Sequence, residues 1–504
     1  MDLSVIYILA GILLPLWILW RSRDPKEKRL VQAIEKLPGP IRMPVLGTTY
    51  IMIGVTREGL WDKINEYIHK FWPLFRTWNG SIPEIQIMEA DHMEPILRSS
   101  VNIKKGYVYD FLHPWLGTGL LTSTGQKWFA HRKLITPTFH FKILENFQEV
   151  FVEKTQILVE KLQKEVGNSK GFDVYPYITR CALDIICETA MGTEVNAQEN
   201  INSPYVDAIY DISEIIIRRM LRPWLRNDFV YSFTKDGKRY KECLEILHSF
   251  TTKVIREKKA NLKNQTTQQE TQHDDLGRKR RVAFLDLLLE ASQGDTVLSD
   301  EDIREEVDTF MFEGHDTTSA SLCWTLFLLG NYPEVQEKVF EEQASIFQDS
   351  GRQPNTQDLA EMKYLERVIK ESLRLYPSVP IILRHLTEDV TVGEHTLPAG
   401  SHATLHIYHA HRNPKYFPNP EAFDPDNFLP ERVQGRHPYA YVPFSAGSRN
   451  CIGQKFALLE EKTVLSAVLR RFRVRALDAP SDVRLYAELV LRPQGGIRLV
   501  IEPR

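Results

Sequence analysis

The chain has 504 residues, 63 of them Lys or Arg and 66 Asp or Glu, and its formal net charge is −3. This near-neutral balance argues against nucleic acid as the main partner, and 43% hydrophobic residues exclude general disorder. The five cysteines are scattered and form no CxxC pair, which disfavours a disulfide framework or a zinc ribbon. The length would suit about three domains. Because no Gly/Ser/Pro-rich linker divides the chain, one large domain is equally open.

The N-terminal segment predicts a membrane anchor. Leu3 to Trp20 contains no charged residue, and a helix needs about 17–25 apolar residues to cross a bilayer. Basic residues follow the segment directly and none precedes it, so residues 1–20 read as a transmembrane signal-anchor with the body on the cytosolic side. A cleaved signal peptide is disfavoured, since it would begin with basic residues and end with small ones.

Behind the anchor, residues 21–45 form a basic flank and a proline-rich hinge containing Leu37 to Pro40, LPGP. We assign residues 46–504 to a single body. Residues 60–256 read as amphipathic helices broken by Pro and Gly. Residues 259–281 are strongly polar and contain no aromatic side chain, which predicts a mobile loop inside the body.

The longest predicted helix runs from Ser299 to about Leu329, with Ser299 as N-cap and three acidic residues in its first turn. Gly314, Thr317 and Ser321 share one small, polar face of this otherwise hydrophobic helix. A mid-helix Gly costs about 1 kcal/mol relative to Ala. The pattern therefore favours a flat group packed on that face.

Shorter patterns follow the long helix. Residues 388–400 and the segment around residues 497–501 predict small β-sheets subordinate to the helices. The histidines His406, His409 and His411 resemble a metal cluster, with His409 and His411 on one side of a possible strand. No Cys or carboxylate completes a tetrahedral set, so we interpret them as solvated or structural.

Near the C-terminus, Cys451 stands in a Gly-punctuated loop just before a strong helical pattern. A helix N-terminus favours a thiolate, so we expect the pKa of Cys451 to be lowered. A thiolate of this kind suits a haem iron that splits oxygen. A small, inert core cysteine is the alternative for this residue taken alone.

The full pattern resembles the haem-binding loop of the cytochrome P-450 superfamily: F-x-x-G-x-x-x-C-x-G at Phe444, Gly447, Cys451 and Gly453. Other family signatures occur in the expected order, namely ESLR at residues 371–374, FDPDNFLPER at 423–432 and WFAHR at 128–132. The resemblance covers essentially the whole chain. It implies a mainly α fold with small β-sheets, a single large haem-thiolate domain after the N-terminal anchor.

Residue roles are implied by the same resemblance. Cys451 would be the axial ligand of haem b, with Phe444 beside the sulfur. Asp316 would relay protons and Thr317 would hydrogen-bond oxygen, although Thr317 could also bond to its own helix. The residues implied to bind the haem propionates are Trp128, Arg132, Arg384 and Arg449. The residues implied to form a structural ion network are Glu371, Arg374 and Arg432.

Glu313 narrows the resemblance. The segment EVDTFMFEGHDTT at residues 306–318 is similar to that of family 4, the fatty-acid ω-hydroxylases, and points to its 4C/4V-type branch. There the Glu can form an ester with a haem methyl. A Glu that only hydrogen-bonds nearby is the alternative.

The resemblance also implies contacts of the body. We expect an apolar substrate channel lined by Phe111, Leu112, Trp115, Leu116, Leu489 and Val490, with ordinary core packing as the alternative. A basic face that meets an acidic reductase would comprise Lys127, Lys133, Lys455 and Lys462. An ordinary solvated face is the alternative for these lysines.

The sequence thus predicts a monooxygenase of the endoplasmic reticulum membrane, with electrons from NADPH through cytochrome P-450 reductase and with cytochrome b5 as a further partner. Its substrate would be a long lipophilic molecule, first a fatty acid hydroxylated at the ω end. Terpenoid hormones and foreign compounds such as insecticides are the alternatives. A peroxide isomerase and a non-catalytic haem sensor are other functions that the motifs allow.

Overall fold

A computed structural model describes residues 25–200, 203–266, 283–291, 298–348 and 350–504. The predicted anchor, residues 1–20, lies outside the described residues. Within the described part, no helix has the length and apolarity needed to cross a membrane.

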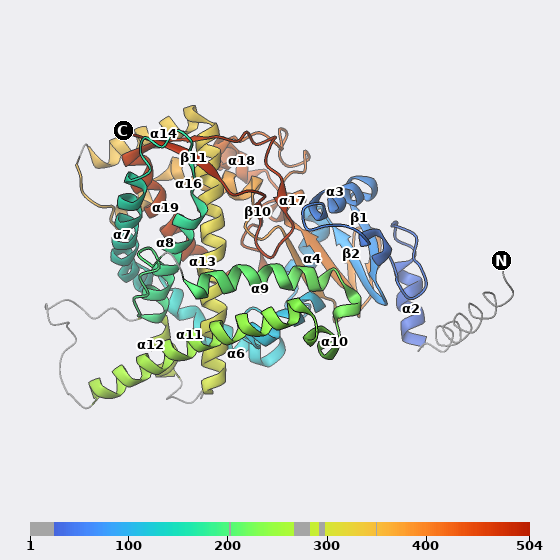
Figure 1. Ribbon diagram of the computed structural model, residues 1–504. Helices are drawn as coiled ribbons and strands as arrows, with labels where there is room; N and C mark the ends of the chain where they lie inside the picture. Colours follow the sequence, from blue (N-terminus) through green and yellow to red (C-terminus); the bar gives the residue numbers. More distant parts are fainter. Residues whose placement is uncertain (1–24, 201–202, 267–282, 292–297, 349) are drawn as a thin grey trace.

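A long helix, α13 (Asp300–Asn331), runs through the middle of the molecule (Figure 1). Ser299 caps it: its hydroxyl accepts from the Asp302 amide, while the Asp302 carboxylate accepts from the Ser299 amide. This reciprocal capping satisfies two amides that helix geometry leaves without partners. The helix predicted from Ser299 to about Leu329 is therefore confirmed, and α14 (Pro333–Phe347) restarts the chain at a proline.

The helices with the most extensive contacts to α13 are α8 (Tyr175–Ile186), α11 (Lys235–Thr266), α16 (Lys363–Leu375) and α19 (Gln454–Arg471). Gly314 permits the close approach of α8, because a Cβ there would lie 2.5 Å from the Ile186 side chain of α8. Gly is unfavourable within a helix, and at position 314 it makes room for α8. This role comes in addition to the one that we expected, a small face against which a flat ligand can pack.

A four-stranded sheet lies to one side of the helices, in the order β1 (Leu74–Asn79), β2 (Ile82–Ile87), β7 (His402–His406) and β4 (Ile381–His385). Figure 1 shows β1 and β2 beside α3 (Leu60–Phe71). The purely helical interpretation of residues 60–256 was therefore wrong for β1 and β2. Their side chains alternate between two faces, as a period of two requires, and both faces carry apolar residues.

The smaller sheets agree with the sequence. Strands β5 (Val390–Val392) and β6 (His395–Leu397) form a small antiparallel sheet within residues 388–400, where one was predicted, and β11 (Arg498–Pro503) pairs with β8 (Phe472–Ala476) and β3 (Phe172–Asp173). Strands β9 (Leu485–Tyr486) and β10 (Arg492–Pro493) flank a turn that reaches the site described below.

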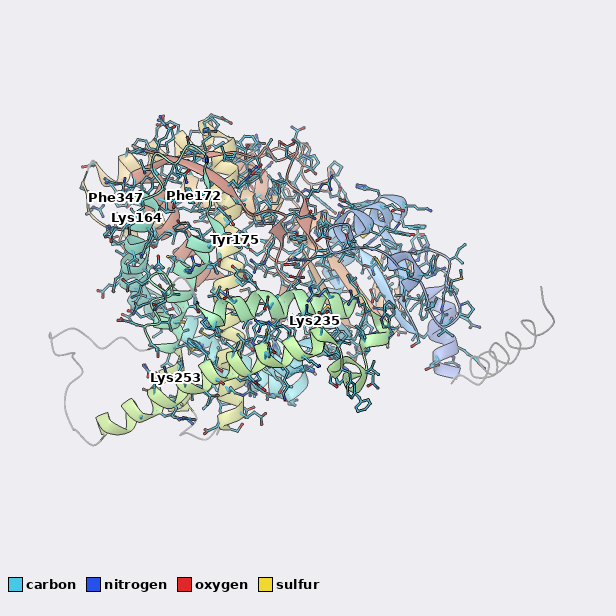
Figure 2. The ribbon with its side chains drawn as sticks, viewed as in Figure 1. Lys164, Phe172, Tyr175, Lys235, Lys253 and Phe347 are labelled. Carbon is cyan, nitrogen blue, oxygen red and sulfur yellow. The ribbon has the colours of Figure 1, made fainter. Side chains whose placement is uncertain are left out.

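The polar segment 259–281 is only partly described. Residues 259–266 continue α11, so the expectation of a loop was wrong there, and residues 267–282 lie outside the described residues. Lys235 and Lys253 mark α11 in Figure 2, and this helix packs against both α13 and α9 (Pro204–Met220). The remaining helices are α2 (Pro25–Ile34), α4 (Ala90–Arg98), α5 (His113–Leu116), α6 (Gly125–Ile135), α7 (Phe141–Gln163), α10 (Asp228–Ser232), α12 (Phe284–Ala291), α15 (Thr356–Glu361), α17 (Ile407–Ala410) and α18 (Pro430–Gln434).

Candidate active site

Cys451 lies in a constrained loop between Phe444 and α19. Its amide donates to the Phe444 carbonyl at 2.8 Å. Gly447 adopts φ +71°, and a Cβ there would lie 1.9 Å from the carbonyl oxygen of Leu97. Only Gly meets both conditions without displacing the backbone. The loop therefore holds Cys451 at the wall of a cavity, which we call the Cys451 cavity.

The Cys451 thiol is exposed toward this cavity. The surrounding protein raises the pKa of the thiol to about 12, and the charge of Glu313 adds to the rise; the amides of Gly453 and Gln454 and the Arg132 cation only partly offset it. The expectation that the helix N-terminus lowers this pKa was therefore wrong for the chain by itself. A thiolate at this position needs a cation at the sulfur, which a coordinated metal provides.

Helix α13 forms another wall of the Cys451 cavity through Glu313, Gly314, Thr317 and Thr318. The Thr317 hydroxyl donates to the Glu313 carbonyl at 2.7 Å, so it bonds to its own helix, as the sequence allowed. The Thr317 carbonyl in turn accepts a hydrogen bond from the Ser378 hydroxyl at 2.7 Å. Side-chain bonds of this kind compete with the helix ladder and perturb it locally.

Asp316 does not line the Cys451 cavity. It is buried and forms an ion pair with Arg492. The Arg492 guanidinium also lies 4.6 Å from the ring of Tyr210 and 5.3 Å from that of Tyr175, the first residue of α8 (Figure 2). Arg492 additionally contacts Glu488 at 3.7 Å. Asp316 and Thr317 are sequence neighbours, yet only Thr317 lines the cavity.

Cationic side chains gather at the Cys451 cavity. Arg132 donates to the carbonyl and side-chain oxygens of Asn450, both at 2.8 Å. Arg449 donates to the carbonyls of Ser123 and Leu121 at 2.7 and 2.8 Å, and lies 4.8 Å from the Trp128 ring. Burial lowers the pKa of Arg449 to about 9, and the charge of Arg384 adds to this lowering.

Lys105 is a third cation at this cavity, and the sequence analysis missed it. Its ammonium lies 4.6 Å from the Tyr109 ring, and its backbone pairs with that of Arg384. Burial, together with the charges of Arg384 and Arg449, lowers the pKa of Lys105 well below its usual range. Arg384 is fully buried behind this wall and is not among the residues that line the cavity.

The Glu313 carboxyl lines the same cavity as these cations. Burial raises the pKa of its carboxyl, and the charges of Lys105, Arg449 and Arg132 partly reverse the rise. Two carboxyls line this cavity, those of Glu313 and Glu461, beside the three cationic side chains. Burial raises the pKa of Glu461 to about 8, so its carboxyl keeps a proton at neutral pH and offsets no cation. A cavity with this charge excess, a thiol on one wall and a hydroxyl on another fits a metal-bearing ligand that carries its own carboxylates, as haem does.

The predicted structural network is only partly formed. Glu371 and Arg374 are completely buried and bond to each other at 2.7 and 2.8 Å. Arg432 does not join them: it is half-exposed and pairs with Asp424 at 2.8 Å. The link is indirect, since the Asp424 amide donates to Glu371 at 2.9 Å. The assignment of Arg432 to the network was therefore wrong at the level of direct contact.

The three histidines are buried and structural. His406 contacts the Gln86 side chain at 2.7 Å, His409 contacts that of Asn65 at 2.8 Å, and His411 accepts from the Val442 amide at 2.8 Å. They are not solvated, and His409 lies in α17 rather than a strand. Among the described residues, no group of His, Cys, Asp and Glu could hold a metal ion.

A second cavity of about 370 Å³ adjoins the first and shares Glu313, Thr317 and Tyr109 with it. We call it the sheet cavity, because β1, β2, β4 and β7 contribute to its wall. Leu112, Leu489 and Val490 line it as expected for a substrate channel. The other three predicted channel residues do not: Trp115 and Leu116 pack in the core, and Phe111 lies beneath the Arg219 guanidinium.

The predicted basic face is also incomplete. Lys133 and Lys455 are exposed. Lys462 is buried and bonds to Glu366 at 2.7 Å, and Lys127 is paired with Asp302 and Glu305 at 2.7 and 2.9 Å. The inclusion of Lys462 was therefore wrong.

Comparison with known proteins agrees with this geometry. Residues 37–500 match the family model described as Cytochrome P-450. Cytochrome P-450 4c3 of Drosophila melanogaster is 50% identical, over 99% of this chain and 94% of its own length. Cytochrome P-450 4c21 of Blattella germanica is 48% identical over 100% of both chains, and cytochrome P-450 4V2 of Homo sapiens is 47% identical over 98% and 95%.

The chain therefore belongs to the cytochrome P-450 family, and within it to family 4 beside the 4C and 4V members. Its mainly helical fold with small sheets is the fold predicted from the sequence, and its enzyme class, a P-450 monooxygenase, is confirmed. Membership implies a thiolate-ligated haem and a redox partner protein.

Proposed function

We propose that the chain hydroxylates long apolar substrates, with haem b held in the Cys451 cavity and the substrate in the sheet cavity. One observation carries the proposal: Cys451 lies on one wall of a cavity and Thr317 on another, and Thr317 also lines the sheet cavity. When bound, haem supplies the chemistry that activates oxygen and transfers it to carbon.

The residues around Cys451 hold and orient the cofactor. Cys451 would provide the sulfur that holds the haem iron, and Phe444, which lines the same cavity, would pack near it. Arg132, Arg449 and Trp128 are the side chains that we assign to the haem propionates, together with Lys105. Guanidinium and ammonium groups are suited to carboxylate oxygens. Arg384 does not line the cavity, and its backbone pairs with that of Lys105. We therefore assign Arg384 to positioning Lys105.

Proton transfer falls to α13. The Thr317 hydroxyl lines both cavities and is the group that we expect to donate a hydrogen bond to oxygen. Asp316, held by Arg492 behind the helix, is placed to exchange a proton with Thr317 only if its side chain turns away from that ion pair. We therefore assign Asp316 a relay role that depends on release from Arg492.

Glu313 is the candidate for a covalent link. Its carboxyl lines the Cys451 cavity. An ester with a haem methyl would form a C–O bond and break a methyl C–H bond, a two-electron oxidation for which turnover would supply oxygen and reductase-derived electrons, and it would remove a buried charge. Acid–acetone extraction tests this link. Haem that stays with the protein after turnover, and leaves freely from a Glu313→Gln variant, supports the ester; free release from the unmodified chain contradicts it.

The apolar wall of the sheet cavity supports a long lipophilic substrate, and fatty acids hydroxylated at the ω end are the first class to test. Terpenoid hormones and foreign compounds are the second. We further propose that NADPH–cytochrome P-450 reductase supplies the electrons, with cytochrome b5 as an additional donor. A location on the endoplasmic reticulum membrane, with the body on the cytosolic face, completes the proposal.

Reconstitution with the reductase tests the function. We expect NADPH consumption that depends on substrate and yields a hydroxylated product from at least one long-chain compound. Product formation from a hydroperoxide without reductase, together with no NADPH-dependent product, would instead support a peroxide isomerase. No turnover of either kind would support a haem sensor.

A further inference from the structure

The sheet cavity has a polar strip on one face of its sheet. Residues two apart on a strand point to the same face, and the strand register places Glu84 beside Thr77, Gln86 beside Thr404, and Ile381 beside His406. This face therefore carries both the apolar cavity wall and a run of polar side chains. The strip consists of Asn79, Glu84, Gln86, Thr404 and His406, all of which line the cavity.

The hydrogen bonds of the strip involve the neighbouring Tyr107 and Thr77, and two of them end at the Glu84 carboxyl. Asn79 donates through its amide nitrogen to the Tyr107 hydroxyl, and Tyr107 donates to Glu84 at 2.6 Å. Gln86 donates through its amide nitrogen to the other Glu84 oxygen at 3.1 Å and to Thr77 at 2.8 Å. The amide nitrogens of Asn79 and Gln86 and the Tyr107 hydroxyl are thereby used as donors.

His406 also takes part in this network, and it does so as a hydrogen-bond donor. Because the Gln86 amide nitrogen is already donating, the Gln86 oxygen must accept from His406 at 2.7 Å. Burial lowers the pKa of His406 to about 3, so the ring is neutral and has a single N–H, at Nε2. Its Nδ1 is then an acceptor, and it has no partner.

Two more atoms of the strip lack partners. They are the Asn79 side-chain oxygen, an acceptor, and the Thr404 hydroxyl, which can donate or accept. Thr404 and His406 are 5% and 3% exposed, so bulk water does not satisfy them. Buried polar groups are rarely left without a hydrogen bond, and together these atoms point to a ligand group that donates one.

The charges at the cavity disfavour an anion at this strip. Among the described residues that line it, Lys63 is the only Lys or Arg, and it is bonded to Glu66 at 2.8 Å. Arg226 lies 5.1 Å from the Tyr107 ring but is not among the lining residues. A substrate carboxylate would therefore meet the Glu84 carboxyl and two acceptors.

We propose that this strip binds the hydroxyl group of a long-chain or terpenoid alcohol, and so sets the polar end of the substrate that the enzyme prefers. The inference rests on the proposed function and narrows its substrate class from fatty acids to neutral alcohols. The hydroxyl donates to Asn79 Oδ1 or His406 Nδ1 and accepts from Thr404. The apolar remainder fills the cavity toward Glu313 and Thr317.

Three ligands of matched size test the proposal on the holoenzyme: dodecan-1-ol, its donor-free isomer 1-methoxyundecane, and dodecanoate. Dissociation constants follow from titration of the haem absorbance. A net hydrogen bond is worth about 0.5–1.5 kcal/mol, so we expect the alcohol to bind about 3- to 10-fold more tightly than the ether. Dodecanoate should bind more weakly than either. Farnesol against farnesoic acid repeats the comparison for the terpenoid source.

Variants locate the effect. Asn79→Leu combined with His406→Phe removes both acceptors and should remove most of the alcohol-over-ether preference. Thr404→Val should weaken the alcohol and the ether alike, because both ligand oxygens accept from Thr404. Thr49→Val is the matched control, because Thr49 lines the same cavity but its hydroxyl is already bonded to Leu46 and Gly80. Equal binding of alcohol and ether, or tighter binding of dodecanoate that Arg226→Gln abolishes, would overturn the proposal. The comparison of the alcohol, the ether and dodecanoate uses only the unmodified enzyme, so it does not depend on the folding of any variant.

The two levels of the account fail differently. If ether and acid are bound and hydroxylated with no preference for the alcohol, only the alcohol site is wrong. If none of the chain-length-matched compounds or terpenoids binds or is oxidised, the alcohol site and the proposed function fall together.

Discussion

The Cys451 cavity and the sheet cavity share Glu313 and Thr317, yet their other polar side chains differ in kind. Lys105, Arg132 and Arg449 give the Cys451 cavity an excess of cations. The sheet cavity presents acceptors from Asn79, His406 and Glu84, and its lysine is already paired. These side chains favour ligand groups of different kinds in the two adjoining cavities: on our proposals, carboxylates in the first and a neutral hydrogen-bond donor in the second.

The largest effect should come from a shared residue. Thr317→Val removes the hydroxyl that lines both cavities, and because positioned proton donors contribute about 10²–10⁴-fold, we expect hydroxylated product per NADPH to fall by about 100-fold. The ratio of product to NADPH measures this. Thr318→Val is the control, because Thr318 bonds its own helix in the same way but does not line the sheet cavity. If the ratio of product to NADPH fell equally in both variants, Thr317 would not be the specific hydrogen-bond donor that we propose.

The buried Glu371–Arg374 ion pair should tolerate substitution far less than the half-exposed Arg432–Asp424 pair. Removing one partner of a buried ion pair costs about 3–5 kcal/mol, which is our expectation for the free energy of unfolding of Arg374→Leu. Arg432→Leu breaks the half-exposed pair with Asp424 and should cost at most about 1 kcal/mol. Denaturant unfolding measures both. If both variants lost a similar free energy of unfolding, Arg432 would belong to the structural network after all.

The cation excess can be reduced by one charge. Lys105→Met should speed haem transfer to an acceptor protein about tenfold, since a charge-assisted hydrogen bond contributes about 1.5–3 kcal/mol. Its exposed neighbour gives the control, because Lys104→Met changes the same charge outside the cavity. If the two variants release haem at the same rate, Lys105 does not face a propionate.

A smaller effect should appear with pH. Glu461 lines the Cys451 cavity, and burial raises the pKa of its carboxyl to about 8. The folded chain thus retains a proton that the unfolded chain loses above about pH 4.5, so this group makes the folded state less stable as pH rises from about 4.5 to 8. Melting temperatures of Glu461→Gln should fall less across this range than those of the unmodified enzyme. The exposed Glu431→Gln should change nothing.

Motifs with fixed local spacing were predictable: the α13 capping pattern, the Cys451 loop and the enzyme family follow from residues close together in the chain. Contacts between distant segments were not. Lys105 is an isolated lysine until its backbone pairs with Arg384, and Lys462 has a helix-surface pattern but is buried by Glu366. The acceptor strip depends on the register of β2 with β7, segments more than 300 residues apart, which no local pattern contains.

The central claim is that the sulfur of Cys451 binds the haem iron. The absorbance spectrum of the ferrous carbon monoxide complex tests this claim most directly. The folded enzyme should show the strongly red-shifted band that thiolate ligation produces, and Cys451→His should lose that band while haem is still bound. A band at the position typical of histidine ligation in the unmodified, folded enzyme would contradict the account.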